Sequence, residues 1–328
     1  MRTIRTLWRR GFVAAMLMTV VSFGSAQTML SIATGGTGGV YFPYGGGLAE
    51  LISNHIDGFS AIAEVTGASV ENVGLISRGE SDVALALADT VYQAFFGTGA
   101  FEDRQLSDLR TLAAIYPNAV HLVALEGSGI TSLADLAGRR VSVGAPGSGT
   151  EVSAQAILNA NGLTYDDIDA QRLNFNETAN ALRDGDIDAG FWSVGPPTSS
   201  ILDLATTRDI VIIAFSDEEI ANAQAIEPVF APYTLPAGTY PGVDEDVLII
   251  STPNVLVVSA DMDDDLAYAI VETLFAHVDE LIAIHPAAND TTVAFTMDAT
   301  PIPLHPGALR YFQDIGATIP ERLLSTAP

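Results

Sequence analysis

The chain alternates short apolar runs with segments whose apolar residues recur at helical spacing. Residues 30–34, 60–65 and 83–88 are typical of buried strands, and residues 48–55 and 69–78 between them have the period of amphipathic helices. Glycine-rich segments separate these elements. This βαβαβ order predicts a mostly parallel sheet with helices on both faces.

A second set of elements is predicted after residue 110. It begins with a long extended stretch, Leu112 to Leu125, interrupted by Pro117, and ends with a long helix from Asp264 to Ile284. Further strands are predicted at 140–143, 172–175, 189–192, 210–215, 247–251 and 255–259, and further helices at 130–138, 150–159 and 178–183. We therefore expect two α/β lobes joined by two crossings, with residues 27–126 and 245–328 in one lobe and residues 127–244 in the other.

The first 26 residues have the pattern of a secretory signal peptide. Four arginines within the first ten residues precede an apolar run from Gly11 to Phe23, and small residues follow up to Ala26. The apolar run is shorter than the roughly 20 residues that a membrane-spanning helix needs. We therefore expect cleavage after Ala26 and a periplasmic protein.

Charge and composition exclude several classes of function. The chain has 14 basic and 40 acidic residues, and its net charge of −26 repels nucleic acids and anionic lipid headgroups. It contains no cysteine and no lysine, which excludes thiol nucleophiles, Schiff bases and the lysine of a phosphate-binding loop. GxGxxG, GxSxG and HExxH patterns are also absent. We expect a binding protein with no catalytic residue, no cofactor, no metal ligand and no nucleic-acid partner.

Four loops that follow predicted strands are the candidate binding segments. Ligands of open α/β sheets lie at the carboxyl ends of the strands, where helix N-termini offer free N–H groups. The four segments are ATGGTGGVYFPYGG (33–46), TGAS (66–69), the residues from Asp89 to Tyr92, and GAPGSGT (144–150). Tyrosines in the first segment can form a wall of a small pocket.

The fourth of these loops is the best candidate for binding an anion. Ser148, Gly149 and Thr150 offer backbone N–H groups and two hydroxyls at the start of a helix, which suits a carboxylate. A turn that only caps the helix fits the same residues. Asp89 fits either a partner for a ligand ammonium group or a helix cap. The residues alone leave both pairs of alternatives open.

Five segments resemble, in the same order, the TAXI family of solute receptors, which are the extracytoplasmic binding proteins of one branch of TRAP transporters. They are ATGGTGGVYFPYGG (33–46), VTGASVENVGLISRGESDVALALADTVY (65–92), LADLAGRRVSVGAPGSGTE (133–151), ALRDGDIDAGFWSVGPP (181–197) and PIPLHPGALRYFQDIG (301–316). Together they extend over nearly the whole chain that follows the predicted signal peptide.

The resemblance implies a periplasmic-binding-protein-like fold of type II, in which two α/β lobes close around a ligand in the cleft between them. It implies a monomeric receptor that captures a small carboxylate solute, such as glutamate, a related amino acid or a dicarboxylate. The receptor would deliver this solute to a fused integral-membrane TRAP permease driven by an ion gradient. The ligand-binding role is carried onto Gly38, Gly39, Tyr41, Thr66, Ser69, Asp89, Ser148, Gly149, Thr150, Trp192 and Ser193.

One position departs from the family pattern. Ala68 stands where relatives often have glycine, and its methyl group would narrow the pocket.

Two other functions stay open. A sensor of the same fold would present the ligand to a membrane kinase instead of a permease. A secreted hydrolase using an acid pair would turn its ligand over.

Overall fold

The computed structural model describes residues 27–324, so the predicted signal peptide lies outside the described residues. The strands are β1 (Thr28–Ala33), β2 (Phe59–Glu64), β3 (Val83–Leu87), β4 (Leu109–Leu125), β5 (Arg140–Ser142), β6 (Asp169–Gln171), β7 (Ala189–Val194), β8 (Ile210–Ile212), β9 (Ala231–Leu235) and β10 (Val247–Ser259). The α-helices are α1 (Tyr41–His55), α2 (Ser69–Ser77), α3 (Ala88–Phe96), α4 (Gly149–Ala160), α5 (Phe175–Asp184), α6 (Ser199–Ala205), α7 (Asp217–Ile226), α8 (Asp264–Ala276), α9 (Val278–Ile284), α10 (Val293–Ala299) and α11 (Pro306–Asp314).

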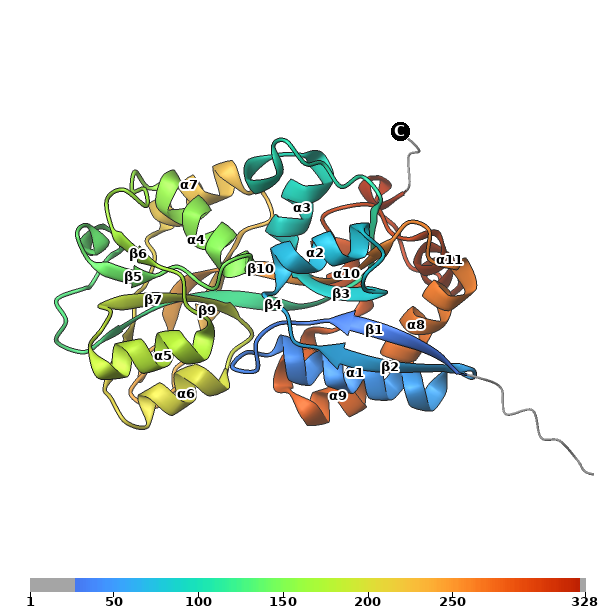
Figure 1. Cartoon of the computed structure of the whole chain (residues 1–328), viewed down its shortest axis with the longest axis horizontal. Helices are drawn as coiled ribbons and strands as arrows, with labels where there is room; N and C mark the ends of the chain where they lie inside the picture. The colour runs from blue at the N-terminus through green and yellow to red at the C-terminus, as the bar shows by residue number, and fades with distance from the viewer. Residues whose placement is uncertain (1–26, 325–328) are drawn as a thin grey trace, which may run out of the picture.

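Within these residues the ten strands form one continuous sheet with helices on both faces (Figure 1). The strand order is β2-β1-β3-β10-β4-β7-β5-β6, with β8 paired to β4 and β9 paired to β10. The pairs of β1 with β2 and β3, and of β5 with β6 and β7, are parallel, whereas β4 and β10 run antiparallel to their neighbours. The predicted α/β class is therefore confirmed.

The sheet has two halves that share the long strands β4 and β10. At its start, near residue 110, β4 pairs with the C-terminal part of β10, which also pairs with β3. Residues 119–125 of β4 pair instead with β7 and β8. We call the side with β1–β3, α1–α3 and α8–α11 the first half, and the side with β5–β9 and α4–α7 the second half (Figure 1). The predicted lobe boundaries fall at the outer ends of β4 and β10, and the division into two independent lobes stays a prediction.

The chain passes between the halves at a weak point of the sheet. Pro117 of β4 lies opposite Pro253 of β10, and the register of this ladder shifts between Asn254 and Val255. Proline has no N–H group to donate to a neighbouring strand, so the ladder loses hydrogen bonds at this pair. The sheet therefore bends most easily where the two halves join.

The glycine-rich segment after residue 40 differs from its prediction. We expected a turn up to Gly46, but α1 already begins at Tyr41 and includes the three glycines before Leu48. Gly45 packs on Thr34, and Gly47 packs on the side chain of Ile284, so closely that a Cβ atom at either position would collide. Gly45 and Gly47 are therefore required for close packing of the helix and not for a turn.

Several other predicted elements have different limits. The helix predicted from Asp264 to Ile284 is interrupted at His277, whose φ of −122° lies outside the helical region. The strand predicted at 172–175 lies at 169–171. The two strands predicted at 247–251 and 255–259 form the single strand β10, because the antiparallel pairing with β4 continues through Pro253.

Candidate ligand-binding site

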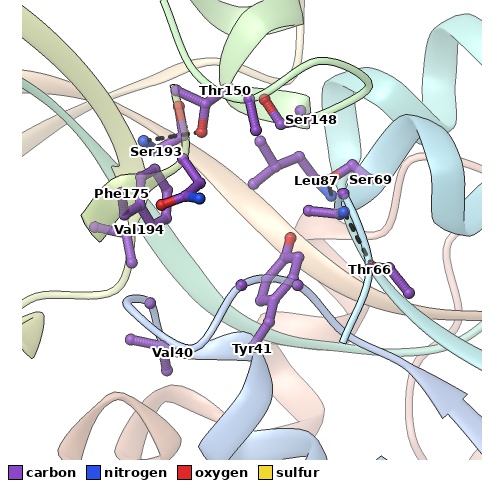
Figure 2. A pocket seen from close by; sticks show the side chains of 18 of the residues that line it. Val40, Tyr41, Thr66, Ser69, Leu87, Ser148, Thr150, Phe175, Ser193 and Val194 are labelled. Atoms are coloured by element: carbon purple, nitrogen blue, oxygen red, sulfur yellow. Dashed lines mark hydrogen bonds between the residues drawn. The ribbon is translucent and has the colours of Figure 1, made fainter. Parts of the chain in front are cut away.

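A cavity of about 260 Å³ lies between the two halves, next to the point where β4 and β10 cross from one to the other. Figure 2 shows Tyr41, Thr66 and Ser69 of the first half facing Thr150 and Ser193 of the second half. The complete lining is Gly35, Gly36, Gly39, Val40, Tyr41, Val65, Thr66, Gly67, Ala68, Ser69, Leu87, Asn118, Ala145, Ser148, Gly149, Thr150, Asn174, Phe175, Ser193 and Val194. A ligand in this cavity would therefore contact both halves.

Four helices begin at the cavity, two from each half. Their first residues are Tyr41 of α1, Ser69 of α2, Gly149 of α4 and Phe175 of α5, and all four line the cavity. The N–H groups of a first helical turn have no acceptor within the helix, and the helix dipole is positive at this end. Within residues 27–324, no residue that lines the cavity has a charged side chain. The backbone is thus the source of positive potential at the site.

The start of α4 is built by a side-chain cap. Ser148 Oγ accepts a hydrogen bond of 3.2 Å from the N–H group of Glu151, which satisfies one of the free donors of the first turn. Thr150 Oγ1 accepts a hydrogen bond of 3.4 Å from the N–H group of Ser193. The hydrogen of the Thr150 hydroxyl therefore remains free for a ligand, as do the N–H groups that the cap does not use.

Ala68, at the start of α2, has a backbone conformation that favours glycine. Its φ of 78° and ψ of −148° lie in a region that residues with a Cβ atom rarely adopt. No other non-glycine residue of the described chain has a positive φ. Glycine adopts this conformation without strain, so the turn before Ser69 is one that glycine would fit better than alanine.

A buried hydrogen-bond network connects the cavity to the strand crossing. The Tyr41 hydroxyl donates to Asn254 Oδ1 at 2.5 Å, and Asn118 Nδ2 donates to the same oxygen at 3.0 Å. Asn118 Nδ2 also donates to the carbonyl of Ser193 at 3.0 Å, and Asn254 Nδ2 donates to the carbonyl of Tyr116 at 3.1 Å. Burial raises the pKa of Tyr41 well above its usual value, so its hydroxyl stays a donor. The network joins α1, β4, β7 and β10.

The two halves touch each other around the cavity. The carbonyl of Gly147 in the second half accepts hydrogen bonds from the N–H groups of Val70 and Glu71 of α2, at 3.1 and 3.2 Å. The carbonyl of Gly38 in the first half accepts a hydrogen bond of 3.2 Å from Thr198 Oγ1. These contacts define a closed arrangement of the halves.

Eight of the eleven residues predicted to bind ligand line the cavity. They are Gly39, Tyr41, Thr66, Ser69, Ser148, Gly149, Thr150 and Ser193. The structure brings these residues together from four separate segments of the chain. Their contact with a ligand stays a prediction.

The geometry does not support direct ligand contact by the other three residues. Asp89 is fully buried outside the lining, because its Oδ2 accepts a hydrogen bond from Ser153 of α4. Trp192 is also fully buried, and its Nε1 donates to Ser200 Oγ at 3.2 Å on the opposite face of β7 from Ser193. Gly38 also lies outside the lining, and its carbonyl accepts a hydrogen bond from Thr198 Oγ1.

Sequence reasoning missed several lining residues, of which Asn118 and Phe175 matter most. Asn118 follows Pro117 inside an apolar stretch. A polar residue at an interruption of a strand could have indicated a position that lines the cavity. Phe175 was assigned to the end of a strand, whereas it is the first residue of α5. Its ring enters the cavity wall and stacks on Trp192, with the ring centroids 6.3 Å apart.

A group that could hold a metal ion lies on the surface, away from the cavity. It consists of His55 at the end of α1, His277 between α8 and α9, and Glu280 of α9. Glu280 Oε1 lies 3.3 Å from His55 Nε2 and 3.1 Å from His277 Nδ1. We expected no metal ligand, because 222 positions separate His55 from His277 and no local spacing reveals their contact.

The fold and the cavity define a periplasmic-binding-protein-like α/β protein, as the sequence analysis predicted. A family model for the NMT1-like family matches residues 32–316, and the chain belongs to this family. Membership of the TAXI branch stays a prediction. Within residues 27–324, no helix has both the length and the apolar character needed to cross a bilayer.

Several solved structures have a similar fold. A protein from Bordetella bronchiseptica RB50 matches with a TM-score of 0.53 and 18% identity, over 90% of this chain and 91% of that chain. A protein from Xanthomonas citri bound to chloride ion matches with a TM-score of 0.50 and 14% identity, over 88% of this chain and 95% of that chain. The alkanesulfonate-binding protein SsuA from Xanthomonas axonopodis pv. citri, bound to MOPS, matches with a TM-score of 0.48 and 16% identity, over 88% of this chain and 92% of that chain.

Proposed function

We propose that this protein is the solute-binding receptor of a TAXI-type TRAP transporter and that it binds a small carboxylate in the cavity between its halves. The observation that carries the proposal is the convergence of four helix N-termini on a cavity without a charged side chain. Such a site favours an anion through backbone N–H groups and helix dipoles. Membership of the NMT1-like family and the five segments that resemble TAXI receptors support the same function.

The carboxylate would bind where α2 and α4 begin. Ser69 and Gly149 offer first-turn N–H groups from opposite halves, and the Thr150 hydroxyl adds a third donor. Hydrogen bonds to a charged group contribute about 1.5–3 kcal/mol each. The net charge of the whole chain is −26 and repels an anion, so the local amides must overcome this repulsion. We propose that the donors at the site determine affinity more than the net charge does.

Ligand contact with both halves would drive closure. A solute that bonds Ser69 and Thr150 together stabilises the closed arrangement over one in which the halves separate. Differential contacts of about 3–5 kcal/mol convert a mostly open protein into a mostly closed one. The prolines at the crossing, Pro117 and Pro253, are where the sheet would bend. We propose that only the closed form delivers its solute to the permease.

The anion role is tested by removing donors at the start of α4. Replacing Ser148 and Thr150 together by alanine should weaken carboxylate binding at least tenfold in calorimetry, since two hydroxyls at the anion site are lost. Thr150→Ser, which keeps the hydroxyl, is the matched control. Binding of every carboxylate at wild-type affinity by the double variant would remove the anion role.

We also propose that the protein is a periplasmic monomer that acts after cleavage behind Ala26. The mass of the protein recovered from the periplasm tests the cleavage site. Transport by a reconstituted permease only in the presence of this protein would support the receptor function, whereas capture by a membrane kinase alone would indicate the sensor alternative.

A further inference from the structure

The charge and hydrogen-bond pattern of the cavity narrows the class of solute. Building on the proposed receptor function, we infer that the solute is a 2-hydroxy monocarboxylic acid with a short branched apolar chain, and not an amino acid or a dicarboxylate. Three independent features of the cavity lead to this class: the absence of charged side chains, the apolar wall and two buried polar atoms without partners.

An amino acid would bring an ammonium group that the cavity cannot neutralise. The lining residues of the described chain include no carboxylate, and an unpaired charge in a buried site is strongly disfavoured. Asp89 is the acidic residue of the candidate set, but its two oxygens accept hydrogen bonds from Ser153 Oγ and from the N–H group of Thr90. It therefore lies in the contact between the halves and outside the cavity lining.

The apolar wall disfavours a second carboxylate. The donors at the start of α2 and α4 lie at one side of the cavity, where Val70 and Glu71 have already given their N–H groups to the carbonyl of Gly147. The remaining wall is largely apolar, and its side chains are Val40, Val65, Leu87, Phe175 and Val194. A ligand that fits this wall carries its charge at one end and a hydrocarbon body at the other.

Two lining residues each have a buried polar atom without a hydrogen-bond partner among the described residues. Asn118 is 2% exposed and Ser193 is 5% exposed, and neither Asn118 Oδ1 nor Ser193 Oγ has a hydrogen-bond partner within residues 27–324. The orientation of Asn118 is fixed, because its Nδ2 donates to both Asn254 and the Ser193 carbonyl. Its Oδ1 can only accept, so it needs a donor.

A ligand hydroxyl satisfies both atoms at once. It donates to Asn118 Oδ1 and accepts from Ser193 Oγ, whereas a 2-oxo group has no hydrogen to donate to Asn118 Oδ1. An ammonium group could donate to both atoms, but it brings a charge that no side chain of the described lining balances. Leaving such buried groups unpaired is costly. The hydroxyl must lie near the carboxylate, because Ser193 is hydrogen-bonded through its N–H group to Thr150 at the anion site.

The volume of the cavity sets the size of the acid. About 260 Å³ corresponds to roughly eight or nine water molecules at about 30 Å³ each. A cavity of this size has room for a small branched acid such as 2-hydroxy-4-methylpentanoate.

The test uses four ligands of one shape that differ only at the second carbon. They are 2-hydroxy-4-methylpentanoate, 4-methylpentanoate, 4-methyl-2-oxopentanoate and leucine, with succinate and glutamate added. Calorimetry on the full mature protein, freed of bound solute, should give the tightest binding for the hydroxy acid. We expect about fivefold weaker binding for the unsubstituted and oxo acids and at least about a hundredfold weaker binding for leucine, glutamate and succinate.

Two variants test the roles of Ser193 and Asn118. Ser193→Ala should reduce the preference for the hydroxy acid over 4-methylpentanoate from about fivefold to about twofold, because the bond to Asn118 Oδ1 remains. Ser60→Ala in β2, outside the cavity lining, should keep the full preference. Asn118→Asp introduces a carboxylate and should improve leucine relative to the hydroxy acid by at least about tenfold. The comparison of ligands on the wild-type protein tests the inference even if neither variant folds.

The outcomes separate this inference from the proposed function. Tighter binding of leucine, glutamate or succinate than of the hydroxy acid overturns the inference, and if the alanine substitutions at Ser148 and Thr150 still weaken that binding, the receptor function stands. A hydroxyl preference that Ser193→Ala leaves intact also overturns it. Failure of every acid to bind overturns both proposals.

Discussion

Asp89 Oδ2 accepts a hydrogen bond of 2.5 Å from Ser153 Oγ, and this bond joins α3 of the first half to α4 of the second half. A second buried bond joins the halves nearby, since Gln93 Nε2 donates to Glu227 Oε1 at 2.5 Å. Glu227 Oε2 has no hydrogen-bond partner within the described residues. Both carboxyl groups are therefore buried by contact between the halves, and separation of the halves would return them to water.

Protonation of these two carboxyl groups should favour the closed form. Burial raises the pKa of Asp89 from 3.8 to about 6, and burial together with the nearby Asp89 charge raises that of Glu227 from 4.5 to about 7. The closed form thus binds more protons than an open form with ordinary pKa values, so its extra stability is complete at low pH and is lost as the pH rises through about 6 and about 7.

We therefore predict weaker solute binding at pH 8 than at pH 5, measured by calorimetry in one buffer series. Within this range a ligand carboxylate with a pKa of about 4 stays largely ionised, so it does not produce the trend. The double variant Asp89→Asn, Glu227→Gln should bind with little pH dependence, whereas Asp203→Asn at an exposed site of α6 should behave as the wild type. The same slope in the double variant and the wild type would contradict the prediction.

A methyl group at Gly149 should prevent closure without harming the fold. A Cβ atom there would lie 2.6 Å from Leu87 Cδ1 and 2.6 Å from Ser69 Oγ, both in the opposite half. When the halves separate, the clash disappears, and alanine is a better helix residue than glycine. Gly149→Ala should therefore keep its melting temperature in the absence of solute but lose at least about tenfold in solute affinity, since about 1.4 kcal/mol of closure energy suffices for that loss.

Small-angle scattering provides the second measurement for this variant. The wild-type protein should contract when solute is added, and Gly149→Ala should not. Gly46→Ala in α1 is the matched control, because a Cβ atom at that position meets nothing within 4 Å. Contraction of Gly149→Ala to the wild-type dimensions would show that the halves tolerate the methyl group.

The sequence predicted the strand-end loops better than it predicted which side chains face the cavity. Glycine and serine patterns indicate where a chain turns and a helix begins, so Ser69, Ser148 and Thr150 could be identified as cavity residues from local signals. Asp89 has the same kind of local signal, but its partner Ser153 lies 64 positions away on another helix. Which side of α3 meets α4 is a tertiary property that no local pattern contains.

The strand crossing could be predicted only in part. Pro117 marked an interruption in the long apolar stretch, and the pairing of Pro117 with Pro253 was not visible because it depends on the register of two distant strands. For the same reason β10 was read as two strands. The contact of Asn118 with Asn254 follows from that register, so the polar network beside the cavity could not be foreseen.

Replacing Ala68 by glycine should stabilise the protein. The backbone at Ala68 has a φ of 78° and a ψ of −148°, and such strain costs about 1–3 kcal/mol for a residue with a Cβ atom. Glycine removes the strain but adds up to about 1 kcal/mol of unfolded-state entropy. We expect a net gain of about 1 kcal/mol in the free energy of unfolding, measured by urea denaturation. Ala145→Gly, at another lining position without a positive φ, should instead lose stability.

Asn254→Ala should strongly destabilise the molecule, because Asn254 holds the crossing together. Its Oδ1 accepts hydrogen bonds from both Tyr41 and Asn118, and Asn254 is fully buried. Each buried donor left without an acceptor costs about 1–3 kcal/mol, so the free energy of unfolding should fall by about 3 kcal/mol in urea denaturation. Asn180→Ala at an exposed position of α5 should change it by less than about 0.5 kcal/mol. An equally small change for Asn254→Ala would mean that the network does not join the halves, and the crossing would then depend on strand pairing alone.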